Sequence, residues 1–227
     1  MPHSWELVKQ QQERLLIATC VPPGGISIDW ALAFAALEKP PGWDFMRLTG
    51  LPWDCARTQA AYQMLNAGHQ WLFFLDSDLL VPPNTITRLM SHRLPIVSAL
   101  YHQRFPTWIG TEALYLPCLF NEGRDTQGNP VRQAITNFQY GQLVEAHYVP
   151  AGALLVHRSV FERMLAAGIK RFFEWTLTAD NPVGRSEDFE ACARWRAIGF
   201  KCFCDTGLQA IHETTGKVDV RGLSIKL

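Results

Sequence analysis

Apolar and polar positions along the chain predict short buried strands separated by helices. The apolar runs at 15–20, 71–75 and 96–100 are too short for helices and indicate strands that are covered on both faces. Further strands are expected at 43–48, 148–157 and 200–204. Helical spacing of apolar residues occurs at 27–37, 56–67, 84–90, 159–167 and 187–198. Strands that alternate with helices predict an α/β fold with one mostly parallel, Rossmann-like sheet flanked by helices, which binds ligands at the carboxyl ends of its strands.

The stretch 101–146 departs from this alternation. It is rich in Gly, Pro, Asn and Gln with interleaved aromatic residues, which predicts loops and a small antiparallel ribbon. The strand at 148–157 is interrupted by Pro150-Ala151-Gly152. Because no internal repeat or interdomain linker is visible, we expect a single domain over 1–227.

Composition narrows the class of protein. With 48% hydrophobic and 19% charged residues among 227, the chain is apolar enough for a globular core. Its 21 basic and 21 acidic side chains cancel, which argues against a dedicated non-specific nucleic-acid binder. No apolar run approaches the roughly 18 to 20 residues that cross a bilayer, so we expect no membrane span and a soluble, cytoplasmic protein. The six scattered cysteines are expected to be reduced.

The candidate chemistry begins at Asp76-Ser77-Asp78, directly after the strand at 71–75. In extended backbone the side chains at positions i and i+2 point the same way, so both carboxylates can face one ion or its ligands. Carboxylate oxygens suit Mg²⁺ or Mn²⁺, ions that keep coordination positions open for phosphate. The alternative is a solvated turn with two incidental acids.

Two other enzyme classes place an acid after such a strand. A P-loop NTPase needs a glycine-rich loop upstream, whereas Thr215-Gly216-Lys217 follows the acids and lacks the first glycine. A haloacid-dehalogenase-like phosphatase has its D-x-D after the first strand with Thr or Val next. Here the motif lies more than seventy residues in and Leu79 follows it.

Five elements, in order across most of the chain, resemble GT-A glycosyltransferases, particularly the family-2-like and phage-type members. They are Thr19-Cys20-Val21-Pro22 after the first strand, Cys55-Ala56-Arg57-Thr58 at a helix start, the D-x-D motif, Val149-Pro150-Ala151-Gly152 before a strand, and Ser186-Glu187-Asp188 at a later helix start. The helix motif departs from the family's "ARN" because Thr58 replaces Asn. The resemblance implies a GT-A fold with a nucleotide-binding half (1–110) and an acceptor-binding half (111–227).

The resemblance also implies roles for particular residues. The donor is a nucleotide-diphosphate sugar, with a UDP-sugar favoured, and the cofactor is Mn²⁺ or Mg²⁺. Asp78 and His212 are expected to bind the cation, with Asp76 as a further ligand or a contact to the ribose. Residues expected to border the nucleotide-sugar are Thr19, Pro22, Arg57, Asp76, Ser77 and Gly152.

An inverting transfer needs a general base for the acceptor hydroxyl. We expect Asp188 in that role, with Glu187 second. Each residue also has a plain alternative: Glu187 and Asp188 as acids that favour the helix macrodipole, Arg57 as a solvated helix-start arginine, Gly152 as relief of crowding, and His212 as a surface histidine.

Aromatic and polar side chains of the irregular middle and beyond are candidates for binding the acceptor: Tyr101, His102, Arg104, Trp108 and Trp175. Aromatic rings stack on sugars and bases alike, so a glycan and a nucleic acid both stay open. By analogy with phage-type members, a hydroxymethylated DNA base is one candidate acceptor, and the location would then be the host cytoplasm. Alternative functions are a nucleotidyltransferase, although the basic residue of its glycine-rich loop is missing from Pro22-Pro23-Gly24-Gly25, and a non-catalytic nucleotide-sugar or glycan-binding module.

Overall fold

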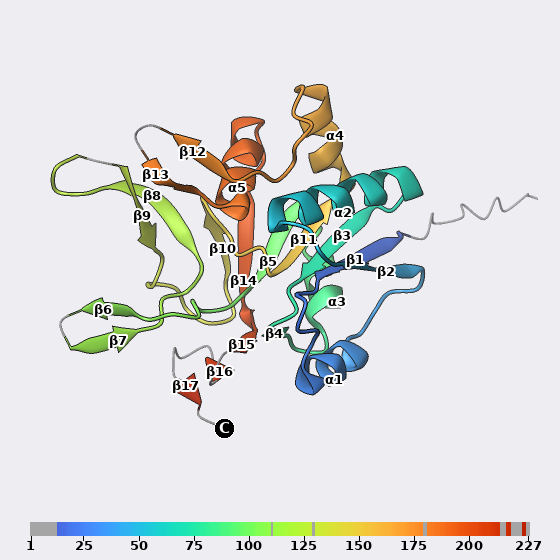
Figure 1. Cartoon of the computed structure of the whole chain (residues 1–227), viewed down its shortest axis with the longest axis horizontal. Helices are drawn as coiled ribbons and strands as arrows, with labels where there is room; N and C mark the ends of the chain where they lie inside the picture. Colours follow the sequence, from blue (N-terminus) through green and yellow to red (C-terminus); the bar gives the residue numbers. More distant parts are fainter. Residues whose placement is uncertain are drawn as a thin grey trace, which may run out of the picture.

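The computed structural model describes residues 13–109, 111–128, 130–178, 181–213, 217–218 and 224–225. Its central sheet contains the strands β1 (Leu15–Cys20), β2 (Trp43–Leu48), β3 (Trp71–Leu75), β5 (Ile96–Leu100), β10 (Leu143–Ala146), β11 (Ala153–His157) and β14 (Cys202–Gln209). These strands are ordered β10-β14-β5-β11-β3-β1-β2 (Figure 1). β1, β2, β3, β5 and β14 run in one direction, and β10 and β11 run in the other. The predicted α/β class with a mostly parallel sheet is confirmed.

Helices cover both faces of this sheet. The helices α2 (Trp53–Ala67), α4 (Arg158–Ala166) and α5 (Glu187–Ala197) lie on one face, and α1 (Ile28–Ala36) and α3 (Thr85–Ser91) lie on the other (Figure 1). Alternate residues of one strand enter opposite layers: Phe74 packs under α2, α4 and α5, whereas its neighbour Phe73 packs toward α1 and α3. Burial on both faces explains why these strands read as continuous apolar runs.

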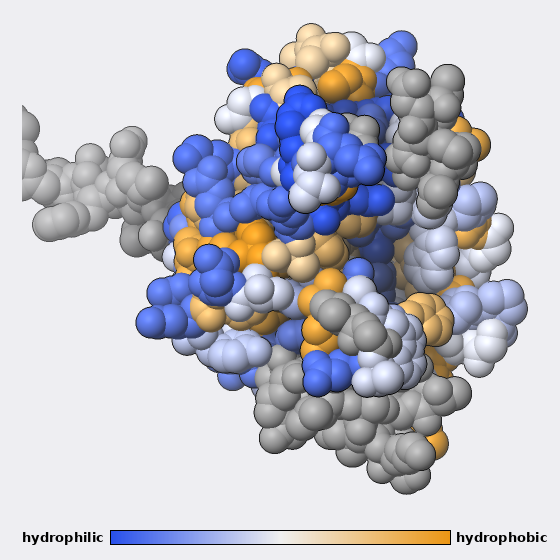
Figure 2. Space-filling model, turned by 90° about the vertical axis from the view of Figure 1, so that its left-hand side faces the viewer, coloured by the Kyte–Doolittle hydropathy of each residue, from blue (hydrophilic) through white to orange (hydrophobic). Residues whose placement is uncertain are grey.

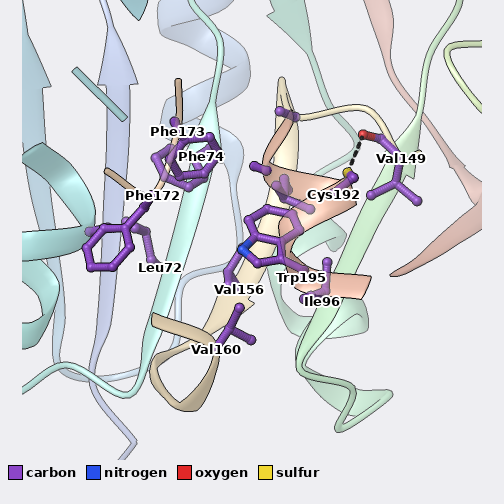
Figure 3. Close-up of a cluster of buried hydrophobic side chains, with 14 of the residues drawn as sticks. Leu72, Phe74, Ile96, Val149, Val156, Val160, Phe172, Phe173, Cys192 and Trp195 are labelled. Atoms are coloured by element: carbon purple, nitrogen blue, oxygen red, sulfur yellow. Dashed lines mark hydrogen bonds between the residues drawn. The ribbon is translucent and has the colours of Figure 1, made fainter. Parts of the chain in front are cut away.

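The layer beneath α2, α4 and α5 contains a cluster of aromatic rings (Figure 3). Phe173 packs edge-on against Phe74 at 5.2 Å and against Trp195 at 5.7 Å between ring centroids. Because β3 supplies Phe74 and α5 supplies Trp195, these contacts pack α5 against β3 through Phe173.

Short antiparallel pairs surround the central sheet. β6 (Thr107–Ile109) pairs with β7 (Glu112–Leu114), β8 (Phe120–Arg124) with β9 (Pro130–Ala134), and β12 (Thr176–Thr178) with β13 (Asn181–Arg185). The first two pairs confirm the antiparallel ribbon expected in 101–146. Figure 2 shows the side of the molecule on which these hairpins lie, where hydrophilic and hydrophobic side chains are interspersed.

A second small sheet joins distant parts of the chain. It consists of β4 (Leu79–Leu80), β15 (Ile211–Glu213), β16 (Lys217–Val218) and β17 (Ser224–Ile225), in the order β17-β16-β15-β4. β15 is antiparallel to β4, with His212 opposite Leu79. This pairing brings the region after β14 to the residues that follow β3.

Three predicted boundaries are wrong. α2 begins at Trp53 instead of 56, and β14 extends to Gln209 instead of ending at 204. The strand expected from 148 begins only at Ala153, because Pro150 has no N–H to donate to a strand partner. Among the described residues, no helix is long and apolar enough to cross a membrane. The division at residue 110 stays a prediction.

A candidate nucleotide-sugar pocket at the carboxyl edge of the sheet

One edge of the sheet collects segments from across the chain. β3 and β5 end at this edge and β11, which is antiparallel to both, begins there. A pocket of about 310 Å³ lies at this edge. Its lining consists of Trp53, Arg57, Asp76, Asp78, Tyr101, Arg104, Phe105, Ala151, Ser186, Glu187, Asp188 and His212. Open α/β sheets bind ligands at such carboxyl ends.

Arg57 forms one wall of the pocket with Asp76 and Glu187. Its side chain is 4% exposed, and its Nη2 donates to both carboxylate oxygens of Asp76 at 2.8 and 3.1 Å. Nη1 donates to the carbonyl of Ala151 at 2.9 Å, and Nε lies 3.3 Å from Glu187 Oε1. Burial alone would lower the pKa of Arg57, but the two carboxylates outweigh it and raise that pKa. The guanidinium is therefore a permanent buried cation that joins the end of β3 to the start of α5.

The acids at the start of α5 differ in their surroundings. Burial raises the pKa of Glu187, and the neighbouring Asp188 raises it further, while Arg57 opposes both. Asp188 Oδ1 accepts from the hydroxyl of Ser186 and from Phe189 N, the second at 2.8 Å. These contacts leave the other oxygen of Asp188 for a ligand, whereas the Glu187 carboxylate is held by Arg57.

Asp78 and His212 lie close together in the lining of the pocket. The β4–β15 pairing brings His212 Nε2 to 3.5 Å from Asp78 Oδ2. His212 Nδ1 lies 3.0 Å from the carbonyl oxygen of His102. Because a carbonyl only accepts, Nδ1 carries the proton, and Nε2 presents its lone pair to the pocket. Burial lowers the pKa of His212, and the nearby Arg104 lowers it further, while the hydrogen bond to His102 opposes both.

The chemistry of these two side chains fits a divalent cation. A carboxylate oxygen and the unprotonated nitrogen of an imidazole are ligands of Mn²⁺, and such ions commonly take further oxygens from phosphates. The Asp76 carboxylate also lines the pocket, with both of its oxygens accepting from Arg57, and its role as a further ligand stays a prediction. Within the described part of the chain, no three His, Cys, Asp or Glu side chains are grouped to hold a metal ion.

Gly152 lies behind the pocket and has a packing role. A Cβ at this position would lie 2.5 Å from Leu79 Cδ1, 2.8 Å from Asp76 Oδ2 and 2.9 Å from the Tyr101 hydroxyl. Its N–H donates to that hydroxyl at 3.0 Å. The space beside Gly152 is therefore filled by the protein's own side chains, which favours the relief of crowding over the approach of a sugar to bare backbone.

Several residues expected at the site do not line the pocket. Thr19, Ser77 and His102 are buried, and among the described residues Thr19 Oγ1 has no hydrogen-bond partner. Pro22 lies in the exposed loop after β1. Trp108 and Trp175 are 66% and 55% exposed but do not line it. Of the residues expected to bind the acceptor, only Tyr101 and Arg104 line this pocket.

Two exposed aromatic residues of the lining were missed. Trp53 is 49% exposed and Phe105 is 76% exposed. Trp53 was missed because the helix was predicted to start at 56, which placed this residue in a turn. A large exposed aromatic residue in the first turn of a helix at the ligand edge is a signal that would have identified it.

Comparisons with known proteins concern the fold. No protein-family model matches the sequence, and no curated protein aligns with it significantly. The chain is similar in structure to A197 from STIV, with a TM-score of 0.57, 12% identity and 94% of each chain covered. Looser matches are 4-diphosphocytidyl-2C-methyl-D-erythritol synthase (TM-score 0.43, 11% identity, 95% and 94% covered) and apo UDP-glucose pyrophosphorylase (TM-score 0.42, 7% identity, 87% and 75% covered). The chain shares the overall α/β architecture of A197.

Proposed function

We propose that this pocket transfers a glycosyl group from a nucleotide-diphosphate sugar to an acceptor hydroxyl with the help of Mn²⁺ or Mg²⁺. The observation that carries the proposal is the meeting of Asp78 Oδ2 and the unprotonated Nε2 of His212, 3.5 Å apart, in the pocket whose lining also includes Asp188. A cation ligand pair and a candidate base in one pocket are what metal-assisted sugar transfer requires.

Asp78 and His212 would hold the cation, which offsets the negative charge of the departing nucleoside diphosphate. Trp53 offers an exposed ring beside the pocket on which a nucleobase can stack. Arg57 acts from behind: it fixes Asp76 and Glu187 and offsets their negative charge close to the phosphates. A UDP-sugar is the favoured donor.

Asp188 would accept the proton of the acceptor hydroxyl as its oxygen attacks the anomeric carbon. The Ser186 hydroxyl and Phe189 N hold Oδ1, which fixes the orientation of the carboxylate and leaves the other oxygen to act as base. Glu187 is the weaker candidate because Arg57 holds its carboxylate. The exposed Phe105 at the pocket supports an acceptor with a stacking face, either a glycan or a hydroxymethylated DNA base.

The test is a panel of nucleotide sugars with Mn²⁺ or Mg²⁺, read by thermal shift and by slow release of free nucleoside diphosphate. We expect a metal-dependent shift for one nucleotide, lost in Asp78→Asn and kept in Asp188→Asn, which should lose only turnover. No metal-dependent response to any donor would contradict the proposal. Release of pyrophosphate from a nucleoside triphosphate and a sugar phosphate would favour nucleotidyl transfer instead, and binding without turnover of any donor would favour a binding module.

The acceptor needs a separate experiment. Incubation with the active donor and hydroxymethylated DNA should add the mass of one sugar if that base is the acceptor. Unmodified DNA is the matched control. Transfer to a glycan panel and not to the modified DNA would assign the glycan class.

A further inference from the structure

Arg104 occupies the place where a cation between Asp78 and His212 would lie. Its Nη2 forms an ion pair with Asp78 Oδ2 and lies 3.3 Å from His212 Nε2. These are the same two atoms that face each other across 3.5 Å. Since Nδ1 of His212 carries the ring proton, Nε2 accepts a hydrogen bond from the guanidinium. One positively charged group thus already contacts both of the atoms proposed to hold the metal ion.

The backbone around Arg104 is fixed while its side chain is accessible. Tyr101 is buried, its carbonyl accepts from Cys118 N at 2.9 Å, and Gln103 N donates to the carbonyl of Leu116 at 2.8 Å. The Arg104 side chain, by contrast, is 39% exposed. A long side chain on an anchored backbone can leave Asp78 by rotation about its own bonds, without rearrangement of the sheet.

A divalent ion bound to these two atoms would lie where the guanidinium now lies, and the two positive charges would repel each other. A divalent ion must therefore displace the guanidinium from Asp78. The displaced group needs a new anionic partner, and the phosphates of a donor in the same pocket are the natural one, because arginine pairs well with phosphate oxygens. Binding of the metal would then release Arg104 to pair with the phosphates, and binding of the phosphates would release Asp78 for the metal.

We propose that Arg104 is a specificity-determining residue that blocks the cation site until a diphosphate binds and so couples metal binding to diphosphate binding. This inference rests on the proposed function, since it concerns the same site. Mn²⁺ alone binds weakly because it must displace Arg104. A nucleoside diphosphate draws the guanidinium away and strengthens the binding of Mn²⁺, and by linkage Mn²⁺ strengthens the binding of the diphosphate equally.

The experiment compares Arg104→Met with the unchanged protein, using electron paramagnetic resonance of free Mn²⁺ to measure its dissociation constant with and without UDP. Because an ion pair of this exposure contributes little, we expect Arg104→Met to bind Mn²⁺ alone roughly two- to fivefold more tightly. The factor by which UDP improves Mn²⁺ affinity should fall. Arg104→Lys keeps the charge, so its Mn²⁺ dissociation constants should lie between those of Arg104→Met and of the unchanged protein.

Arg163→Met is the matched control, because Arg163 is an exposed arginine on α4 away from the pocket, and it should leave both constants unchanged. Unchanged or weaker Mn²⁺ binding in Arg104→Met would overturn the inference, as would tight metal-free UDP binding that Arg104→Met abolishes. If Asp78→Asn binds Mn²⁺ as well as the unchanged protein, the proposed metal site itself fails. If Asp78→Asn loses Mn²⁺ while Arg104→Met equals the unchanged protein, only the Arg104 inference fails.

Discussion

At the scale of single residues, the most consequential group is Arg57, a buried cation between two carboxylates. A buried ion pair adds little net stability compared with an apolar pair, but removal of one partner leaves an uncompensated charge. Arg57 forms two such buried ion pairs, one with Asp76 and one with Glu187. Its main effect is therefore on where the two acids lie and whether they are ionised.

Replacement of Arg57 by Met is expected to lower the free energy of unfolding by about 3 to 5 kcal/mol at pH 7, because two mostly buried carboxylates lose their cation. The pKa of Glu187, already above its ordinary 4.5, should rise further. A raised pKa favours the folded protein only while the group is protonated, so the loss should shrink as the pH falls from 7 toward 4.5. Urea denaturation at several pH values measures this. A loss that does not vary with pH would show that the acids are not the cause.

Gly152→Ala tests the packing behind the pocket. The added methyl would press on Leu79, Asp76 and Tyr101, and we expect a loss of about 1 to 3 kcal/mol from overpacking. Gly24→Ala is the control, because a Cβ there meets nothing within 4 Å, and it should stay within about 0.5 kcal/mol. Equal stability of the two variants would contradict the packing role of Gly152.

At the scale of elements, the site depends on pairings between segments far apart in the chain. The β4–β15 pair brings His212 to Asp78, and Arg57 links α2 to the start of α5. A third link joins α3 to β14: the buried Asp205 accepts from Arg88 at 2.6 and 2.8 Å and contacts His92 at 2.8 Å. Each link fixes one element against another with charged hydrogen bonds.

The link at Asp205 gives a prediction about acid stability. Burial raises the pKa of Asp205, but Arg88, His92 and Gly207 N outweigh it, and the pKa lies below the ordinary 3.8. A lowered pKa stabilises the folded protein above that value, and this stability is lost as the pH falls through the folded-state pKa. Asp205→Asn should therefore unfold about 1 to 3 kcal/mol more easily at pH 7. The difference should narrow below pH 3.8, as followed by circular dichroism in urea. A difference that grows on acidification would refute this assignment.

At the scale of the whole molecule, the rigid part and the ligand-facing part are distinct. β3 and β11 are buried along their length and lie in the middle of the sheet, with aromatic packing on one side (Figure 3). The hairpin β6–β7 is exposed, as Trp108 and the strand Glu112–Leu114 show. The pocket lies where the sheet ends, so a rigid base supports side chains such as Arg104 that remain accessible.

Hydrogen exchange followed by mass spectrometry should reflect this division. Amides of β3 and β11 are expected to exchange only by global unfolding, and amides of the β6–β7 hairpin by local opening, because few buried contacts hold the hairpin. Addition of Mn²⁺ and UDP should slow exchange at the residues around Asp78 and Arg104 and leave the hairpin β8–β9 unchanged. Protection confined to other surfaces would place the ligand elsewhere.

Much of the fold and part of the site follow from the sequence. Apolar runs bounded by turn residues predicted β1, β3 and β5, because a strand that is buried on both faces is a continuous run of apolar residues. Local sequence patterns also predicted that Asp76 and Asp78 lie at the carboxyl edge and that Glu187 and Asp188 begin a helix. The ends of helices and strands were predicted less accurately, because a position such as Gly152 is set by its contacts with Leu79, Asp76 and Tyr101.

The sequence by itself placed Asp76 and Asp78 at the carboxyl edge, and the tertiary structure decided which side chains meet there. The pairing of β15 with β4, the burial of Arg57 between two acids, and the position of Arg104 on Asp78 each join segments distant in sequence. Hydrophobic periodicity records whether a residue is inside or outside. It does not record its partner, because partners are set by strand order and helix packing across the whole chain.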